Sequence, residues 1–199
     1  GVAKADSGTI KINGQATNIS SPREAIKNRI ALIPEDRRSQ GLVLDHPVTE
    51  NLTLPILDSL KSNGLLSNKK ILAKSQEIID LFAVKAAQPS IRVGSLSGGN
   101  QQKVVLSKWI YSNPDVLILD EPTRGIDVNA KREIYQLMNE LTKNGVAIIM
   151  VSSELPEVIG MSDRVVVIHE GSVAGVLARE NLTQEKIISL ATGEVNAFT

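Results

Sequence analysis

The sequence contains no cysteine, which excludes disulfide bonds and thiolate metal sites. It also has no excess of charge, because 22 Lys and Arg residues balance 22 Asp and Glu residues. A nucleic-acid-binding surface normally shows as a basic excess, so we expect no nucleic-acid partner. Aromatic residues make up only 3 % of the chain, and we therefore expect Trp109 in the core rather than on a base-stacking surface.

Long apolar segments are absent as well. No apolar run approaches the roughly 18 to 20 residues that a membrane-spanning helix needs, so any membrane role would act through a partner. The 199 residues, 42 % of them hydrophobic, suit one globular domain or a domain with a subdomain. The chain does not begin with methionine, and its first residues are typical of the middle of a domain. We therefore expect a fragment of a longer protein.

The first third of the chain carries three local signals. Asn13 and Gly14 lie between short strand-like runs in residues 9–19 and predict a β-hairpin, because both tolerate a positive φ. Ser21, Pro22 and Glu24 have the spacing of a capping box, which predicts a short helix. The apolar residues 30–33 then predict a buried strand that ends at Pro34.

Residues 45 to about 90 have a different pattern. Apolar residues recur among charges from Ser67 onward, which predicts an amphipathic helix. We interpret its apolar stripe as core contacts: Ile71, Leu72, Ile78, Ile79 and Phe82.

From Val116 onward, buried strands alternate with helices. Residues 116–119 and 146–151 are apolar runs typical of strands buried on both faces, and residues 129–143 have the period of an amphipathic helix. A short helix is expected near residues 154–161, a hairpin over 164–169 and 172–178, and a last helix over 183–192. This order predicts an α/β fold with a parallel sheet covered on both sides.

Two adjacent carboxylates follow the strand of residues 116–119. The carboxyl end of a parallel strand is where open α/β sheets bind ligands. Asp120 is therefore placed to hold Mg²⁺, which prefers a few carboxylates together with phosphates and waters. Glu121 could polarise an attacking water. An acidic strand-to-loop turn without a chemical role has the same pattern, and this motif alone does not decide between them.

A glycine pair precedes a second predicted helix. In "SLSGGNQQKVVLSKW", Gly98 and Gly99 let the backbone approach an anion closely. The helix N-terminus adds unpaired N–H groups and about half a positive charge. The segment is a candidate anion-binding site, although a glycine-rich cap on a structural helix is the commoner use of such a pair.

Taken together, these motifs resemble a known family. "LSGGNQQ", "LILDEPT" about twenty residues later and "RGID" are similar to the signature, Walker B and D-loop of ATP-binding-cassette (ABC) ATPases. "IALIPEDRRSQGL" and "VSSELPEV" resemble the second, C-terminal cassette of the tandem ATPases of bacterial monosaccharide importers of the ribose type. The resemblance covers essentially residues 1–199. It implies a P-loop NTPase-like α/β fold with a parallel sheet, a small antiparallel β part and a helical subdomain over residues 45–110.

The resemblance also implies roles for individual residues. The signature residues Ser97, Gly98, Gly99 and Asn100 would contact the γ-phosphate of ATP on an opposing cassette. Asp120 would serve Mg²⁺, Glu121 would be the general base, and Asp127 would lie at the cassette interface.

Three positions depart from the family pattern. Asn100 stands where glutamine is usual, which is a mild change between two amides. Glu35 replaces the glutamine of the Q-loop and could still bind a cation or water. Ser153 occupies the switch position, where active cassettes usually have histidine, and a hydroxyl is a poor substitute. His169 lies in a strand pattern and does not replace it, and we interpret His46 as a loop histidine.

The phosphate-binding loop of the family is not found. It requires G-x-x-x-x-G-K followed by Ser or Thr, and none of the 14 glycines is followed by lysine. The resemblance places that loop upstream of Gly1. We expect that the fragment begins after it and, by itself, has no ATPase activity above background and only weak nucleotide affinity. An exposed sheet edge and apolar surface would favour its self-association.

Family logic then predicts two unequal sites. Residues 97–100 would complete the site of the first cassette, while Asp120, Glu121 and Ser153 would belong to a weaker site. The implied partners are that first cassette, transmembrane permease subunits and, indirectly, a periplasmic sugar-binding protein, with ATP and Mg²⁺ as ligands. The implied location is the cytoplasmic face of the bacterial inner membrane.

Three functions stay open. The protein is an energy-coupling ATPase subunit for sugar import, a non-hydrolysing regulatory cassette, or a soluble ABC protein of another branch. The balanced charge weakens the third. Arg37 and Arg38 could touch phosphate or a permease carboxylate, but we interpret them as solvated surface charges.

Overall fold

The computed structural model describes residues 1–194. The chain forms two compact units, Gly1–Val151 and a smaller one that begins at Ser152. The first unit is α/β and the second packs helices on a β-hairpin. Among the described residues, no helix is both long enough and apolar enough to cross a membrane.

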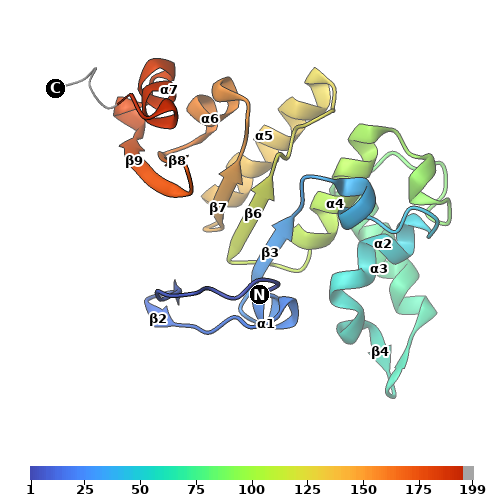
Figure 1. Ribbon diagram of the computed structural model, residues 1–199. Coiled ribbons are helices and arrows are strands. Elements are labelled where there is room, and N and C mark those ends of the chain that lie inside the picture. The colour runs from blue at the N-terminus through green and yellow to red at the C-terminus, as the bar shows by residue number, and fades with distance from the viewer. Residues whose placement is uncertain (195–199) are drawn as a thin grey trace. The chain divides into compact units, whose positions relative to one another are not determined.

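The first unit is built on a three-stranded parallel sheet, as the sequence predicted. Its strands are β3 (Ile30–Ile33), β6 (Val116–Asp120) and β7 (Ala147–Val151), in the order β3-β6-β7 (Figure 1). Both pairings are parallel, with Ile33 opposite Leu119 and Asp120 opposite Val151. Helix α5 (Val128–Lys143) connects β6 to β7, which is the crossover that parallel strands need.

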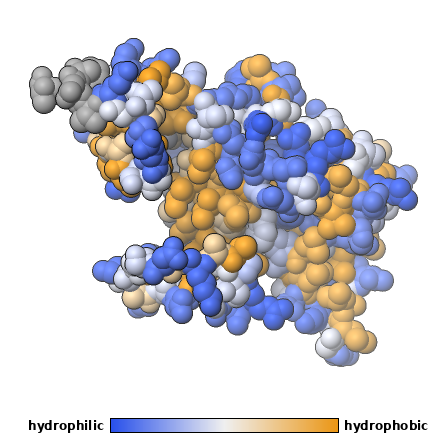
Figure 2. All heavy atoms as spheres, in the orientation of Figure 1, coloured by the Kyte–Doolittle hydropathy of each residue, from blue (hydrophilic) through white to orange (hydrophobic). Residues whose placement is uncertain are grey.

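The prediction that this sheet is buried on both faces is wrong for the described chain. Alternate residues such as Ile33, Leu117 and Leu119 are fully buried. Leu32 and Ile149 point to the other face and remain about half exposed, at 49 % and 54 %. Figure 2 shows apolar residues gathered over these strands. The cause is the two-residue period of a strand, because the elements packed on the sheet cover only one set of side chains.

The N-terminal segment follows its local signals. Strands β1 (Lys11–Ile12) and β2 (Gln15–Ala16) pair in an antiparallel hairpin, and Asn13 and Gly14 both have positive φ, as predicted. Helix α1 (Pro22–Lys27) begins after Ser21, whose hydroxyl accepts from the Glu24 N–H at 3.3 Å. The Glu24 carboxylate accepts from the N–H of Ser20 at 2.7 Å. In a standard capping box it would accept from the N–H of the cap residue itself, here Ser21.

A helical region lies between β3 and β6. It contains a π-helical turn η1 (Arg37–Gly41), α2 (Val48–Thr53), the 3-10 segments η2 (Leu54–Leu60) and η3 (Val93–Ser95), α3 (Asn68–Leu81) and α4 (Gly98–Ile110). Helix α2 packs against both α3 and α4. The region lies wholly within the first unit, and its status as a separate subdomain over 45–110 stays a prediction.

Helix α3 confirms the predicted start after Ser67, whose hydroxyl accepts from the Lys70 N–H. Ile78 and Ile79 are buried as expected, but Leu72 is 58 % exposed. Assigning Leu72 to the core was therefore wrong, because the helix buries a narrower face than its apolar residues suggest. Sequence analysis also missed the short hairpin of β4 (Lys61–Ser62) and β5 (Leu65–Leu66).

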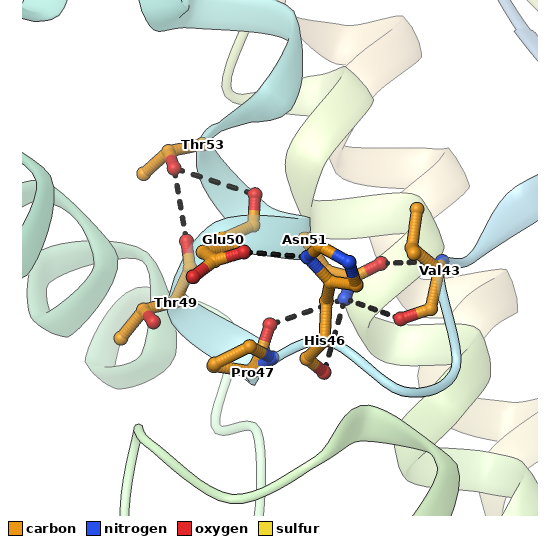
Figure 3. A network of polar contacts seen from close by, with 7 residues as sticks. All are labelled: Val43, His46, Pro47, Thr49, Glu50, Asn51 and Thr53. Carbon is orange, nitrogen blue, oxygen red and sulfur yellow. Dashed lines mark hydrogen bonds and ion pairs between the residues drawn. The ribbon is translucent and has the colours of Figure 1, made fainter. Parts of the chain in front are cut away.

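A fully buried amide holds the loop between η1 and α2. Figure 3 shows the Asn51 side chain lying inside this loop. Its Oδ1 accepts from the Val43 N–H at 2.9 Å, and its Nδ2 donates to the Val43 carbonyl at 3.0 Å and the Pro47 carbonyl at 3.1 Å. Nearby, Nδ1 of His46 lies 2.6 Å from the carboxylate of Glu50. His46 lies between η1 and α2 and is therefore a loop residue, as predicted. Asn51 therefore helps to fix the path of this loop, together with the N–H groups of Val93 and Gly94, which donate to the carbonyls of His46 and Leu44.

The second unit confirms the predicted order of elements. It contains α6 (Leu155–Met161), the antiparallel strands β8 (Arg164–His169) and β9 (Ser172–Ala178), and α7 (Gln184–Thr192). Glu170 and Gly171 form the tight turn, both with positive φ. Val165, Val167 and Ile187 form the core of this unit, against which residues of α6 and β9 pack.

Candidate functional site

The two acidic residues end strand β6, as the sequence predicted. Asp120 is the last residue of the strand and is half-buried. Glu121 follows with φ of 47°, a left-handed conformation that is unusual for a residue with a side chain. Its N–H donates to the carbonyl of Val151 at 2.9 Å, and its carbonyl accepts from the Arg124 N–H at 3.2 Å. The surrounding backbone thus holds Glu121 in a strained conformation at the carboxyl edge of the sheet.

The turn after Glu121 is tied to helix α4. The side-chain amide of Gln102, only 3 % exposed, donates to the carbonyl of Pro122 at 2.9 Å. Thr123 is also buried. These contacts fix the acidic turn relative to the helix that carries the glycine pair, and sequence analysis did not identify Gln102 for this role.

The glycine pair forms the first turn of helix α4. Ser97 is the residue before the helix, is exposed and makes no side-chain cap to its own helix. Its hydroxyl instead accepts from Nδ2 of Asn100 at 3.0 Å, while Oδ1 of Asn100 accepts from the Lys85 N–H at 2.8 Å. Gly98 and Gly99 are half-buried. A helix N-terminus without a side-chain cap has N–H groups that an anion could accept from.

The glycines are needed for close approach to neighbouring segments. A Cβ on Gly99 would lie 3.3 Å from the Cβ of Ala130, and one on Gly98 would lie 3.0 Å from Nη2 of Arg37. Asp127 caps the adjacent helix α5, accepting from the N–H groups of Asn129 and Ala130 at 3.0 Å each. The N-terminal ends of α4 and α5 therefore lie side by side. The described structure gives Asp127 a structural role, and its predicted interface role is untested.

Glu35 lies in the loop after β3 and contacts this turn rather than Asp120. Its carboxylate pairs with the guanidinium of Arg124, with both side chains largely exposed. Arg37 Nη1 donates to the carbonyl of Arg124 at 3.2 Å, and its Nε is buried. The interpretation of Arg37 as a solvated surface charge is therefore wrong, because the half-buried side chain contacts the turn at Arg124 and approaches Gly98 at the start of α4. Arg38 is exposed, as predicted.

Ser153 belongs to the second unit. It is exposed in the loop between β7 and α6. The neighbouring hydroxyl of Ser152 donates to the buried carboxylate of Glu157 at 2.5 Å. His169 ends β8, and its Nδ1 lies 2.7 Å from the carbonyl of Ala191. His169 thus has a local partner within the second unit, consistent with the expectation that it does not replace a switch histidine.

The side chains of residues 1–194 do not form a complete metal site. Within residues 1–194 there is no group of three or more His, Cys, Asp or Glu residues that could hold a metal ion. Asp120 suits Mg²⁺ only together with phosphate oxygens and waters, which is the usual coordination of Mg²⁺ at nucleotide sites. The role of Asp120 as a metal ligand stays a prediction.

Solved structures support the fold. A nucleotide-free ATP-binding cassette from an ABC transporter superposes with a TM-score of 0.76 at 20 % identity, covering 96 % of this chain and 79 % of that one. A dimeric cassette in a post-hydrolysis state bound to ADP and Pi superposes with a TM-score of 0.73 at 20 % identity, covering 89 % and 76 %. The predicted ABC-ATPase fold class is confirmed.

Sequence relatives agree with the structures. The ribose import ATP-binding protein RbsA of Bacillus cereus is 58 % identical over 94 % of this chain, and the RbsA proteins of Lactococcus lactis and Bacillus subtilis are 54 % and 53 % identical over 97 %. The chain spans only 38 % to 39 % of the length of these relatives. The family model described as ABC transporter matches residues 1–124. Because this model matches more than half of the chain, the chain belongs to the ABC transporter family.

Proposed function

We propose that this chain is part of the ATP-binding subunit that powers import of a ribose-type sugar through a membrane permease. The single observation that carries the proposal is the glycine-rich N-terminus of α4, which has no side-chain cap and lies beside the capped end of α5. The names of the similar import proteins supply the substrate class. The other implied partners are a first cassette and a periplasmic sugar-binding protein, and the implied location is the cytoplasmic face of the inner membrane.

The glycine tip would bind the terminal phosphate of ATP held by another cassette. The backbone N–H groups of residues 98–100 and the helix dipole favour a phosphate at this end. Ser97 is exposed beside it, and Asn100 holds its hydroxyl. The similar cassette bound to ADP and Pi is dimeric, which supports the idea of a site shared between two cassettes.

The acidic end of β6 would serve a second nucleotide. Asp120 would hold Mg²⁺, which supplies charge neutralisation of the phosphates when it is bound. Glu121 would accept a proton from the attacking water, and its fixed backbone conformation would aim the carboxylate. Glu35 would contribute only through its ion pair with Arg124.

Ser153 favours one alternative, a cassette that clamps nucleotide without efficient hydrolysis. A serine hydroxyl cannot carry the positive charge that a histidine would place at this position. The two proposed sites are therefore unequal, with residues 97–100 supporting turnover and Glu121 belonging to a weaker site.

The test uses the natural full-length polypeptide that contains this chain. Gly99→Val would push side-chain atoms toward Ala130 and should reduce ATPase activity by about 10²- to 10³-fold, the effect of losing a preorganised anion-binding donor. Glu121→Gln should leave more than half of the activity. Gly160→Ala is the control for the glycine change, because a Cβ there meets no atom within 4 Å.

The outcomes separate the two parts of the proposal. Equal losses of ATPase activity in the Gly99 and Glu121 variants would contradict the proposed inequality of the two sites but not the proposed ATPase function. Full activity in the Gly99→Val variant, with its fold intact by circular dichroism, would contradict the phosphate-binding role of the α4 tip.

A further inference from the structure

The segment after β3 is fastened along helix α4. Asp36 caps η1, accepting from the N–H groups of Arg38 and Ser39 at 2.9 Å and 3.3 Å. The Ser39 hydroxyl donates to the same carboxylate at 2.6 Å, and these hydrogen bonds lower the pKa of Asp36. The π-helical turn is thus a defined element that packs against α4.

One end of η1 lies close to the glycine tip of α4, residues 98 and 99. A Cβ placed on Gly98 would lie only 3.0 Å from Nη2 of Arg37. Nη1 of Arg37 donates to the Arg124 carbonyl at 3.2 Å. A guanidinium presents its donors in a rigid plane, so Arg37 can touch both segments at once. Arg37 therefore bridges the N-terminus of α4 and the turn that leads to α5.

The other end of η1 contacts the far part of α4. A Cβ on Gly41 would lie 3.1 Å from Cγ2 of Val105, so η1 approaches the helix closely there. The Nζ of Lys108, which is 6 % exposed, donates to the Gly41 carbonyl. Two cationic side chains, Arg37 and Lys108, thus fix the ends of η1 against α4 and the acidic turn.

Within the described residues, no ion pair explains the position of the Arg37 side chain. Among residues 1–194 no carboxylate lies within ion-pair distance of its guanidinium, and its buried Nε has no hydrogen-bond partner. Burying a donor without a partner is unfavourable. The position of Arg37 is instead determined by the two backbone segments that it bridges.

We propose that Arg37 is a positioning residue that holds the glycine tip of α4 and the turn at residues 124–127 in their mutual arrangement. The proposal rests on the proposed function, because that arrangement matters where the tip binds phosphate. Glu35 lies in the same loop and pairs with Arg124, so the segment after β3 makes two connections to this turn. A displacement of that segment would be transmitted to the phosphate-binding tip.

The first experiment does not depend on ATP. Amide hydrogen exchange is measured on the full-length natural polypeptide without nucleotide, comparing the unaltered protein with Arg37→Ala and Arg37→Lys. Exchange at residues 98–101 and 124–127 should accelerate about fivefold or more in the alanine variant, because the bridging hydrogen bond is lost. Arg38→Ala is the matched control, since Arg38 has the same charge, lies in the same turn and is exposed. Unchanged exchange in the Arg37 variants would overturn the proposal.

The second experiment measures ATPase kinetics. Arg37→Ala should lower kcat while leaving KM within about twofold, because misplacing the tip weakens the reacting arrangement more than ground-state binding. Arg37→Lys should not restore kcat, since an ammonium group lacks the planar fork. Full restoration by lysine would show that charge alone is needed and would overturn the bridging role.

A double-variant cycle tests the contact itself. Gly98→Ala should displace the Arg37 guanidinium, so its effect on kcat should shrink in the Arg37→Ala background. Fully additive effects would contradict the contact. If the unaltered protein showed no ATPase activity, the proposed function would fail, while the hydrogen-exchange result would still decide whether Arg37 holds the tip.

Discussion

Raising the pH should stabilise this protein through Lys108. The side chain is 6 % exposed, and burial lowers its pKa from 10.5 to about 8. In the unfolded chain the same amine keeps its proton to a higher pH. Between about pH 8 and pH 10.5 the unfolded state therefore binds more protons than the folded state, and the free energy of unfolding rises with pH.

The size of the effect follows from the two pKa values. At 1.36 kcal/mol for each pKa unit, the full difference corresponds to about 3 kcal/mol. The Gly41 carbonyl accepts from Nζ, and the ring of Trp109 lies 5.9 Å from it, and both contacts favour the charged form. We therefore expect a gain of about 1 to 3 kcal/mol between pH 7 and pH 10.

The assay compares urea unfolding of the unaltered protein and the Lys108→Met variant across this pH range. Methionine keeps the length of the side chain without the charge, so the pH-dependent gain should be absent from the variant. At pH 7 the loss of the hydrogen bond to the Gly41 carbonyl opposes the gain from removing a desolvated charge, so the test compares the pH dependence of the two proteins and not their stability at pH 7. Lys143→Met, at an exposed position on α5, should keep the full pH dependence. The reasoning is refuted if both variants show the same pH profile as the unaltered protein.

Asn51→Ala removes a fully buried amide with several backbone partners, so it should cost about 2 to 4 kcal/mol in urea unfolding. The exposed neighbour Glu50, changed to Ala, should cost about 0.5 kcal/mol or less, and equal costs would contradict the assignment. Asp127→Ala removes the cap of α5 and should cost about 1 kcal/mol, whereas Asp127→Asn should keep most of it; a calorimetric scan measures both. Ile149→Thr, on the exposed face of the sheet, should reduce self-association of the 199-residue chain in sedimentation velocity, and an unchanged sedimentation profile would argue against that face as the contact.

Local signals in the sequence predicted most elements correctly. The turn at Asn13-Gly14 uses two residue types that tolerate positive φ, and the turn at Glu170-Gly171 is marked by its glycine. The cap at Ser67 and the strand of β6 are likewise encoded within a few residues. Such features are readable because the interactions that form them join residues close in the sequence.

Burial was harder to predict than secondary structure. An apolar strand has the same composition whether one or both of its faces are covered, so Leu32 and Ile149 could not be distinguished from core residues. The predicted burial of Leu72 on helix α3 was wrong for the same reason. Only the set of neighbouring elements decides which apolar side chains lose contact with water.

The contacts around the candidate site were also beyond the reach of sequence patterns. Arg37 and Arg124 are 87 residues apart in the chain, and the motif pattern gives no sign that they meet. Gln102 lies in the signature helix, yet its hydrogen bond to Pro122 depends on how β6 and α4 pack. The sequence predicted which residues carry the chemistry, and the structure shows which residues hold them in place.

Helix α4 illustrates how that positioning is achieved. Four of its buried side chains are polar, and Ser107 donates within the helix to the Lys103 carbonyl. The other three donate to backbone carbonyls of other segments: Gln101 to Gly94 and Leu96, Gln102 to Pro122, and Lys108 to Gly41. Apolar packing alone is not directional and would tolerate a small rotation of the helix. Sliding α4 by one residue would move it about 1.5 Å and rotate it by about 100°, leaving all three groups unsatisfied. Each unsatisfied group would cost about 1 to 3 kcal/mol, so these hydrogen bonds fix both the rotation of α4 and the direction in which its glycine tip points.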